Sequence, residues 1–136
     1  MGRILGSNIR NVLSILDTVS GKEIDLYYRM PTTSERIAYE SAKFAVDKDG
    51  TIKNRAIDAC QEHGLLILEG FKKGSFHLQL DDGSLKDISS DLLDPDYLPD
   101  WKERIKEQAA DLAMVLGKRI FDSPLYIVNQ ESQRKN

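Results

Sequence analysis

A stripe of apolar residues near the end of the chain is the feature that most constrains its fold. The residues at helical spacing are Trp101, Ile105, Ala109, Leu112, Leu116 and Ile120. The other side of this stretch is charged, so the pattern predicts a long amphipathic helix whose apolar side must be covered. Asp100 followed by Glu103 predicts a capping box at its start. We expect this helix to dock on a sheet and supply much of the core.

Two regions of the chain predict β-hairpins. Residues 12–16 and 24–30 are rich in β-branched and aromatic side chains, and Ser20-Gly21 between them is a turn signal. The apolar run at residues 65–68 is typical of a central strand. The remaining signals belong to a second hairpin and an irregular loop: alternation over residues 76–80, the turn dipeptide Asp82-Gly83, a short strand at 85–88 and two prolines within 93–99.

Two further helices are expected between the hairpins. Thr32 followed by Glu35 predicts a capping box, and the helix after it would run over residues 33–46. A second helix would cover residues 52–63, with Gly64 just beyond its end.

Strands and helices do not alternate strictly, which favours an α+β fold over a parallel α/β sheet. We expect antiparallel β-hairpins packed against two to three helices, including the long C-terminal amphipathic helix. The 136-residue length fits a single domain over residues 1–128, followed by a polar, disordered tail at 129–136.

The composition narrows the classes of function. Hydrophobic residues make up 40% and charged residues 30%, and the net charge is −3, which is not the pattern of a nucleic-acid binder. No run approaches the roughly 18 apolar residues of a membrane span. We therefore expect a cytoplasmic protein that binds neither nucleic acid nor membrane. Cys60 is the only cysteine, which fits a reducing compartment.

Cys60 and His63 lie three residues apart on a predicted helix and could form a thiolate–imidazole pair. The alternative fits better: Cys60 is a small buried residue, and His63 suits the end of a helix. No third group is present to orient the histidine. One cysteine with His63 and His77 does not make a closed zinc site. We expect no catalytic residue, no metal site and no cofactor.

Aspartates are dense between residues 81 and 100. They are Asp81, Asp82, Asp87, Asp91, Asp94, Asp96 and Asp100. A functional interpretation is an acidic surface for a basic partner or a cation, and with His77 it could serve a metal-dependent enzyme. The alternative is that aspartate is favoured in turns and caps.

Aromatic residues are the candidates for protein binding, because tyrosine and tryptophan are enriched at interfaces. We select Tyr27, Tyr28, Tyr39 and Trp101. Either the edge of a hairpin over residues 65–80 or the edge of the first hairpin could accept another strand. Self-association into a homo-oligomer through these edges is equally open.

Three segments together resemble a known family. They are residues 27–36 (YYRMPTTSER) with Tyr39; Ser89-Ser90-Asp91 leading to Pro95-Asp96-Tyr97; and Asp100-Trp101-Lys102 opening a helix that ends at Ile120-Phe121. This combination, from Tyr27 to Phe121, resembles tail assembly chaperones encoded in the tail-morphogenesis regions of phages and prophages.

The resemblance implies a non-enzymatic protein that binds the long, aggregation-prone tape measure protein and keeps it soluble while the tail tube polymerises. It implies no cofactor, and it transfers no functional residue to a numbered position here. Two alternatives stay open: a regulatory or adaptor domain unrelated to phage, and the metal-dependent enzyme of the acidic segment.

Overall fold

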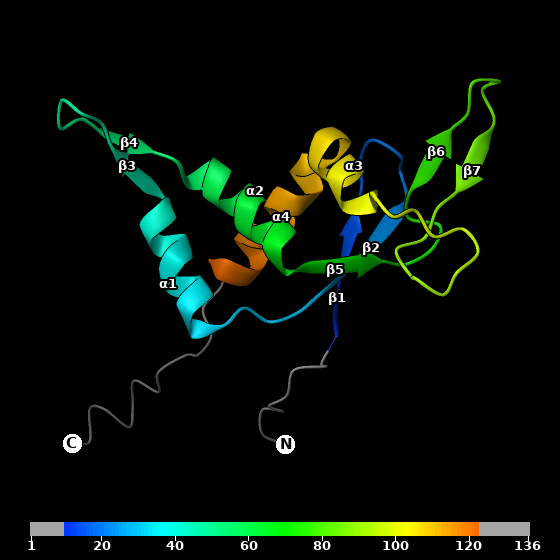
Figure 1. Ribbon diagram of the computed structural model, residues 1–136, viewed down its shortest axis with the longest axis horizontal. Coiled ribbons are helices and arrows are strands. Elements are labelled where there is room, and N and C mark those ends of the chain that lie inside the picture. Colours follow the sequence, from blue (N-terminus) through cyan, green and yellow to red (C-terminus); the bar gives the residue numbers. More distant parts are fainter. Residues whose placement is uncertain (1–9, 123–136) are drawn as a thin grey trace, which may run out of the picture.

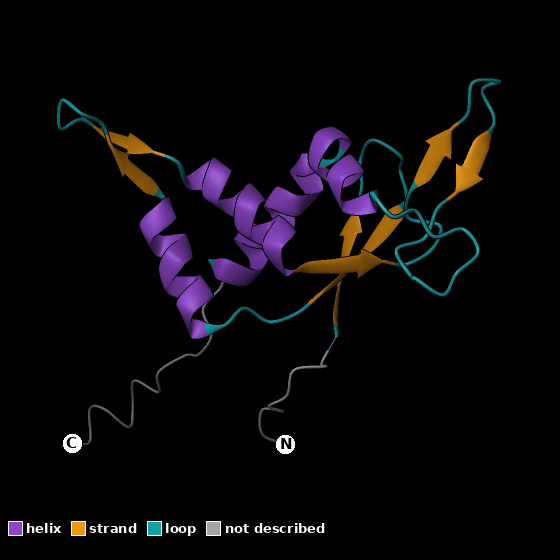
Figure 2. Ribbon diagram, in the orientation of Figure 1, coloured by secondary structure: helices purple, strands orange, loops and turns teal. Residues whose placement is uncertain are grey.

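The computed structural model describes residues 10–122 and has an α+β fold with four helices (Figures 1 and 2). The predicted tail at 129–136 lies outside the described residues. In chain order the elements are β1 Asn11–Leu16, β2 Glu23–Tyr28, α1 Thr33–Ala42, β3 Phe44–Val46, β4 Ile52–Asn54, α2 Ala56–Ile67, β5 Leu68–Phe71, β6 His77–Gln79, β7 Leu85–Asp87, α3 Trp101–Gln108 and α4 Ala110–Phe121. The helices lie in the middle, and the β3–β4 and β6–β7 hairpins project at opposite ends (Figure 1).

The predicted first hairpin forms and is the larger part of a three-stranded antiparallel sheet in the order β1-β2-β5. Alternate residues of β2, Ile24 and Leu26, are buried in the core. Leu13 and Ile15 lie opposite them on β1 and are partly buried on the same face. This alternation is that of a sheet with one face against the core.

The prediction of a strand at residues 65–68 was wrong in its placement. Residues 65–67 finish α2, and β5 begins at Leu68. A short apolar run does not distinguish a helix end from a strand, because the periodicity of so few residues fits both. β5 pairs with β2 rather than with β6, so a hairpin over residues 65–80 does not form. Strands β6 and β7 pair only with each other, around the predicted Asp82-Gly83 turn.

Helices α2 and α4 cross at very small residues. A methyl group added at Gly64 would collide with the backbone carbonyl of Ala113, and one added at Gly117 with that of Cys60. The helices therefore touch through their backbones. The sequence predicts Gly64 just beyond the helix end, but it lies inside α2. A glycine is needed at this position because the contact with α4 leaves no room for a side chain.

The predicted long C-terminal helix is divided at Ala109, whose φ of −141° and ψ of 35° are not helical. The two parts cover different surfaces. Trp101 of α3 meets the Phe71 ring of β5 edge-on, with centroids 5.8 Å apart, whereas α4 packs on α2 rather than on the sheet. The predicted cap is also absent: Asp100 makes no cap bond and instead accepts from Arg104 Nε at 3.2 Å.

Residues 33–46 were predicted as one helix, but α1 ends at Ala42 and residues 44–46 form β3. The predicted helix over 52–63 likewise begins later, at Ala56, whose N–H donates to the Asn54 side chain at 2.9 Å. Phe-Ala-Val and Thr-Ile-Lys flank the turn sequence Asp-Lys-Asp-Gly, in which Gly50 has a φ of 85°. A glycine at positive φ between short β-prone segments is a hairpin signal. Together β3 and β4 form a hairpin, here called the β3–β4 arm.

The predicted capping box at the start of α1 is present. Thr32 Oγ1 accepts from Glu35 N at 3.1 Å, and Glu35 Oε1 accepts from Thr32 N at 2.9 Å. Arg29 also donates two bonds of 2.7 Å to the Glu35 carboxylate. The Arg29 hydrogen bonds and the Thr32 N–H bond outweigh partial burial and lower the pKa of Glu35 from 4.5 to about 2.

Glu35→Gln is expected to lower the free energy of unfolding at neutral pH by about 1–2 kcal/mol. Because the folded-state pKa is depressed, the wild-type contribution is present above about pH 4.5 and is lost as the pH falls toward 2. Denaturant titrations of both proteins across this range should therefore converge at the acid end. The control is Glu62→Gln, at an exposed position of α2. A difference that stays constant with pH would contradict a role for the ionised carboxylate.

Within residues 10–122 no helix is both long enough and apolar enough to cross a membrane.

Candidate functional site

The β3–β4 arm presents three large apolar side chains to solvent. Phe44 is 59% exposed, Val46 71% and Ile52 68%. Val46 lies directly opposite Ile52, and Phe44 is two residues from Val46 on the same strand. Because side chains alternate across a strand, all three share one face, while Ala45 and Lys53 lie on the other. Here we call Phe44, Val46 and Ile52 the apolar face of the arm.

The arm is a defined structure rather than a loose loop. Its base is closed by Arg55 N, which donates to the Lys43 carbonyl at 2.6 Å. Its tip is held by Asp47 N, which donates to the Thr51 carbonyl at 2.9 Å, and by an ion pair of 3.2 Å between Lys53 Nζ and Asp47 Oδ2. The apolar face is thus presented by a hydrogen-bonded hairpin, without the packing that normally covers such side chains.

The four aromatic residues selected from the sequence do not gather on one surface. Tyr27 and Tyr28 are neighbours on β2 and point to opposite faces of the sheet. The guanidinium of Arg10 lies 4.9 Å from the centre of the Tyr27 ring. Tyr28 and Trp101 are partly buried against the core. Tyr39 is only 1% exposed, so its side chain belongs to the core and not to a surface.

Tyr39 is the centre of a buried polar cluster. Its hydroxyl donates to Asp122 Oδ1 at 2.8 Å and lies 3.1 Å from Cys60 Sγ. Lys43 Nζ is 3.1 Å from the same Asp122 oxygen. Burial raises the pKa of the Tyr39 hydroxyl, and the bonds to Cys60 and Asp122 raise it further. The hydroxyl therefore stays protonated, and the cluster fastens α1 to α2 and to the end of α4.

Cys60 is buried, as predicted for a small core residue. The prediction that His63 lies at a helix end was wrong, because α2 continues to Ile67. His63 Nδ1 is 3.0 Å from the Ala59 carbonyl, and its ring packs edge-on against Tyr39 and Phe121. Its contacts are those of a partly buried histidine packed between two aromatic rings.

Three of the seven aspartates of the 81–100 segment organise the backbone. Asp82, Asp91 and Asp94 each accept a hydrogen bond from the backbone N–H two residues later. Lys73 Nζ pairs with Asp94 at 3.0 Å and Asp96 at 2.8 Å, and these two carboxylates raise the pKa of Lys73 to about 12. The geometry is that of aspartate in turns. Among residues 10–122, no group of three or more His, Cys, Asp or Glu side chains could hold a metal ion.

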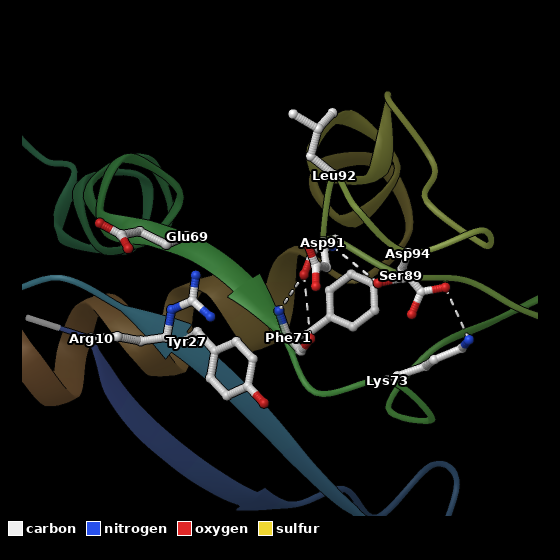
Figure 3. Close-up of a pocket in the computed structure, with 10 residues that line it drawn as sticks. Arg10, Tyr27, Glu69, Phe71, Lys73, Ser89, Asp91, Leu92 and Asp94 are labelled. Atoms are coloured by element: carbon white, nitrogen blue, oxygen red, sulfur yellow. Dashed lines mark hydrogen bonds and ion pairs between the residues drawn. The ribbon is translucent and has the colours of Figure 1, made fainter. Parts of the chain in front are cut away.

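A pocket of about 480 Å³ lies between the outer face of the sheet and the 89–94 loop (Figure 3). Its lining residues are Arg10, Tyr27, Glu69, Phe71, Lys73, Ser89, Ser90, Asp91, Leu92 and Asp94. Several polar groups already have partners: Ser90 Oγ accepts from Phe71 N at 2.9 Å and donates to the Phe71 carbonyl at 3.3 Å. Ser89 Oγ likewise accepts from Asp91 N at 3.0 Å, so both serine hydroxyls of the lining are bonded to backbone groups.

The apolar face of the arm was missed from the sequence, because residues 33–46 were interpreted as helix. The signal that identifies it is the turn Asp47-Lys48-Asp49-Gly50 between two short β-prone segments.

Compared with known proteins, the chain matches no family model, no curated protein and no solved structure.

Proposed function

We propose that this chain is a non-enzymatic assembly protein that binds an apolar segment of another protein through the β3–β4 arm. The observation that carries the proposal is the exposure of Phe44, Val46 and Ile52 on one face of a well-formed hairpin. Large apolar side chains gathered on one exposed surface are typical of protein-binding sites.

The charges around the arm indicate what kind of partner it fits. Asp47, Lys48, Asp49 and Lys53 alternate in sign around its tip and strands. A rim of mixed sign keeps the arm soluble and does not select for a strongly charged partner. The recognised feature of the client is therefore an apolar segment.

The resemblance to phage tail assembly chaperones supplies the class of client. A long tape measure protein exposes apolar stretches before the tail tube encloses it, and a small protein with an exposed apolar arm is suited to cover them. An adaptor domain unrelated to phage would use the same surface for a different client, so only the partner distinguishes the two functions.

The experiment is purification of the tagged chain from its native host during phage induction, followed by mass spectrometry. The expected dominant partner is a long tail protein, and co-expression of the two should increase the soluble fraction of that protein. Recovery of a metabolic or regulatory complex instead would favour the adaptor function. Recovery of no specific partner would contradict both.

A further inference from the structure

We propose that β1 pairs edge to edge with β1 of a second copy of the chain, which makes the protein a homodimer. This inference concerns the sheet and not the arm, so it does not depend on the proposed function. Within residues 10–122, β1 has β2 on one side and no strand on the other. In Figure 3, β1 in dark blue lies on the side of β2 away from β5.

The backbone groups of β1 that have no partner strand within residues 10–122 can be identified from the pairing of β2. The carbonyl of Asp25 accepts from Lys72 N at 3.0 Å, so the N–H and C=O groups of Asp25 point toward β5. In antiparallel sheets this direction alternates, so Leu26 turns toward β1 and bonds with its partner Leu13. Val12, Ser14 and Leu16 of β1 therefore direct their N–H and C=O groups outward.

The two edges of the sheet differ in how they are protected. On β5, the outward N–H and C=O of Phe71 are both occupied by the Ser90 hydroxyl. On β1, none of the six residues is charged and none is proline. Charges and prolines are the usual means of preventing strand addition at an edge. The sequence of β1 is thus that of a strand that accepts another one.

Charged residues just beyond the two ends of β1 indicate which strand pairs with its free edge. Arg10 precedes the strand and Asp17 follows it. When two copies of β1 pair antiparallel, Arg10 of each copy lies at the same end as Asp17 of the other. A parallel arrangement would place like charges together. Arg10 stacks on Tyr27 and the Asp17 carboxylate accepts from Val19 N and Ser20 N, so the charges act through the field at the two ends and not as a direct ion pair. This field favours an antiparallel second copy as the partner.

The outward groups restrict the register of the pair, because Val12, Ser14 and Leu16 of one copy must face the same set in the other. All three outward residues are paired when the two-fold axis passes between the two Ser14 residues, so that Val12 of one copy lies opposite Leu16 of the other. Val12 and Leu16 are 52% and 73% exposed in the single chain, and the pairing would cover both. Leu13 would lie opposite Ile15 and extend the core. The product is a continuous six-stranded sheet in the order β5-β2-β1-β1-β2-β5.

The test is the molar mass of the full chain by light scattering after size exclusion, with folding checked by circular dichroism. We expect twice the chain mass of 15.4 kDa. Combining Val12→Lys with Leu16→Lys places like charges opposite each other and should raise the dissociation constant of the dimer by at least about 100-fold. Combining Val12→Lys with Leu16→Glu places opposite charges there and should restore it. Val19→Lys, in the turn after β1, is the control and should remain a dimer.

A second readout tests the register without disturbing charge. Residues paired across an antiparallel ladder have Cα atoms about 5.5 Å apart, which is within disulfide range. Ser14→Cys should therefore cross-link to itself under mild oxidation, whereas Val19→Cys should not. A wild-type monomer at the highest concentration measured would overturn the proposal. So would a dimer that persists with both lysines, or a Lys–Glu pair that fails to restore it in a folded chain.

Discussion

Gly64→Ala and Gly117→Ala are each expected to lower the free energy of unfolding by about 3 kcal/mol or more, at the upper end of overpacking effects. The added methyl groups would meet the carbonyls of Ala113 and Cys60, which are backbone atoms and cannot rotate away. Alanine stabilises a helix by about 1 kcal/mol relative to glycine. The expected loss of stability therefore arises from the steric clash between the two helices alone. Urea denaturation of each variant measures the effect.

The matched controls are Glu62→Ala on α2 and Lys118→Ala on α4, both at exposed positions. They should stay within about 0.5 kcal/mol of wild type. Glycine variants as stable as these controls would show that α2 and α4 do not touch through their backbones.

Replacing Phe44, Val46 and Ile52 together with threonine is expected to weaken client binding by at least about 100-fold, or about 2.7 kcal/mol. Each buried apolar anchor is worth about 1.5–3 kcal/mol, so losing three should exceed this bound even with partial burial. Threonine keeps the β-propensity of the strands. The side chains are exposed in the free chain, so its stability should change little. Isothermal calorimetry with the purified client measures the binding.

The matched control carries threonine at Val19, Leu92 and Leu93, which are at least as exposed but lie outside the arm. It should bind the client like wild type. Equal losses in both triple variants would indicate nonspecific apolar contact and contradict a site on the arm.

The parts of the fold that were predicted correctly depend on local chemistry. The Thr32 and Glu35 capping box involves residues three apart, and the hairpin β1–β2 follows from alternation around one turn. Such features are determined within a few residues, so a single sequence reveals them. The predicted α+β class is confirmed. This class depends on which helices and strands form and not on the residues at which they begin and end.

The errors occur where tertiary contacts decide the local structure. Gly64 has the properties of a helix-ending residue, but contact with α4 keeps it inside α2. The apolar stripe from Trp101 to Ile120 continues through Ala109, where the helix breaks so that its two parts meet different partners. The missed signal was a pair of small residues four apart on each helix, Cys60 with Gly64 and Ala113 with Gly117.

The proposed site was missed from the sequence because of the same kind of error. Residues 44–46 were predicted as the end of a helix, and the candidate residues chosen instead include Tyr39, which is in the core. Aromatic residue type alone does not separate an interface residue from a core residue, because both environments favour large apolar surface.

Site-specific photocross-linking tests the central claim most directly. A photoreactive phenylalanine analogue at Phe44 should capture the client in cells during tail assembly, and the same analogue at Leu93 should not. Recovery of one long tail protein from Phe44 alone is the result we predict. Equal capture at both positions, or capture at Leu93 only, would contradict binding through the arm.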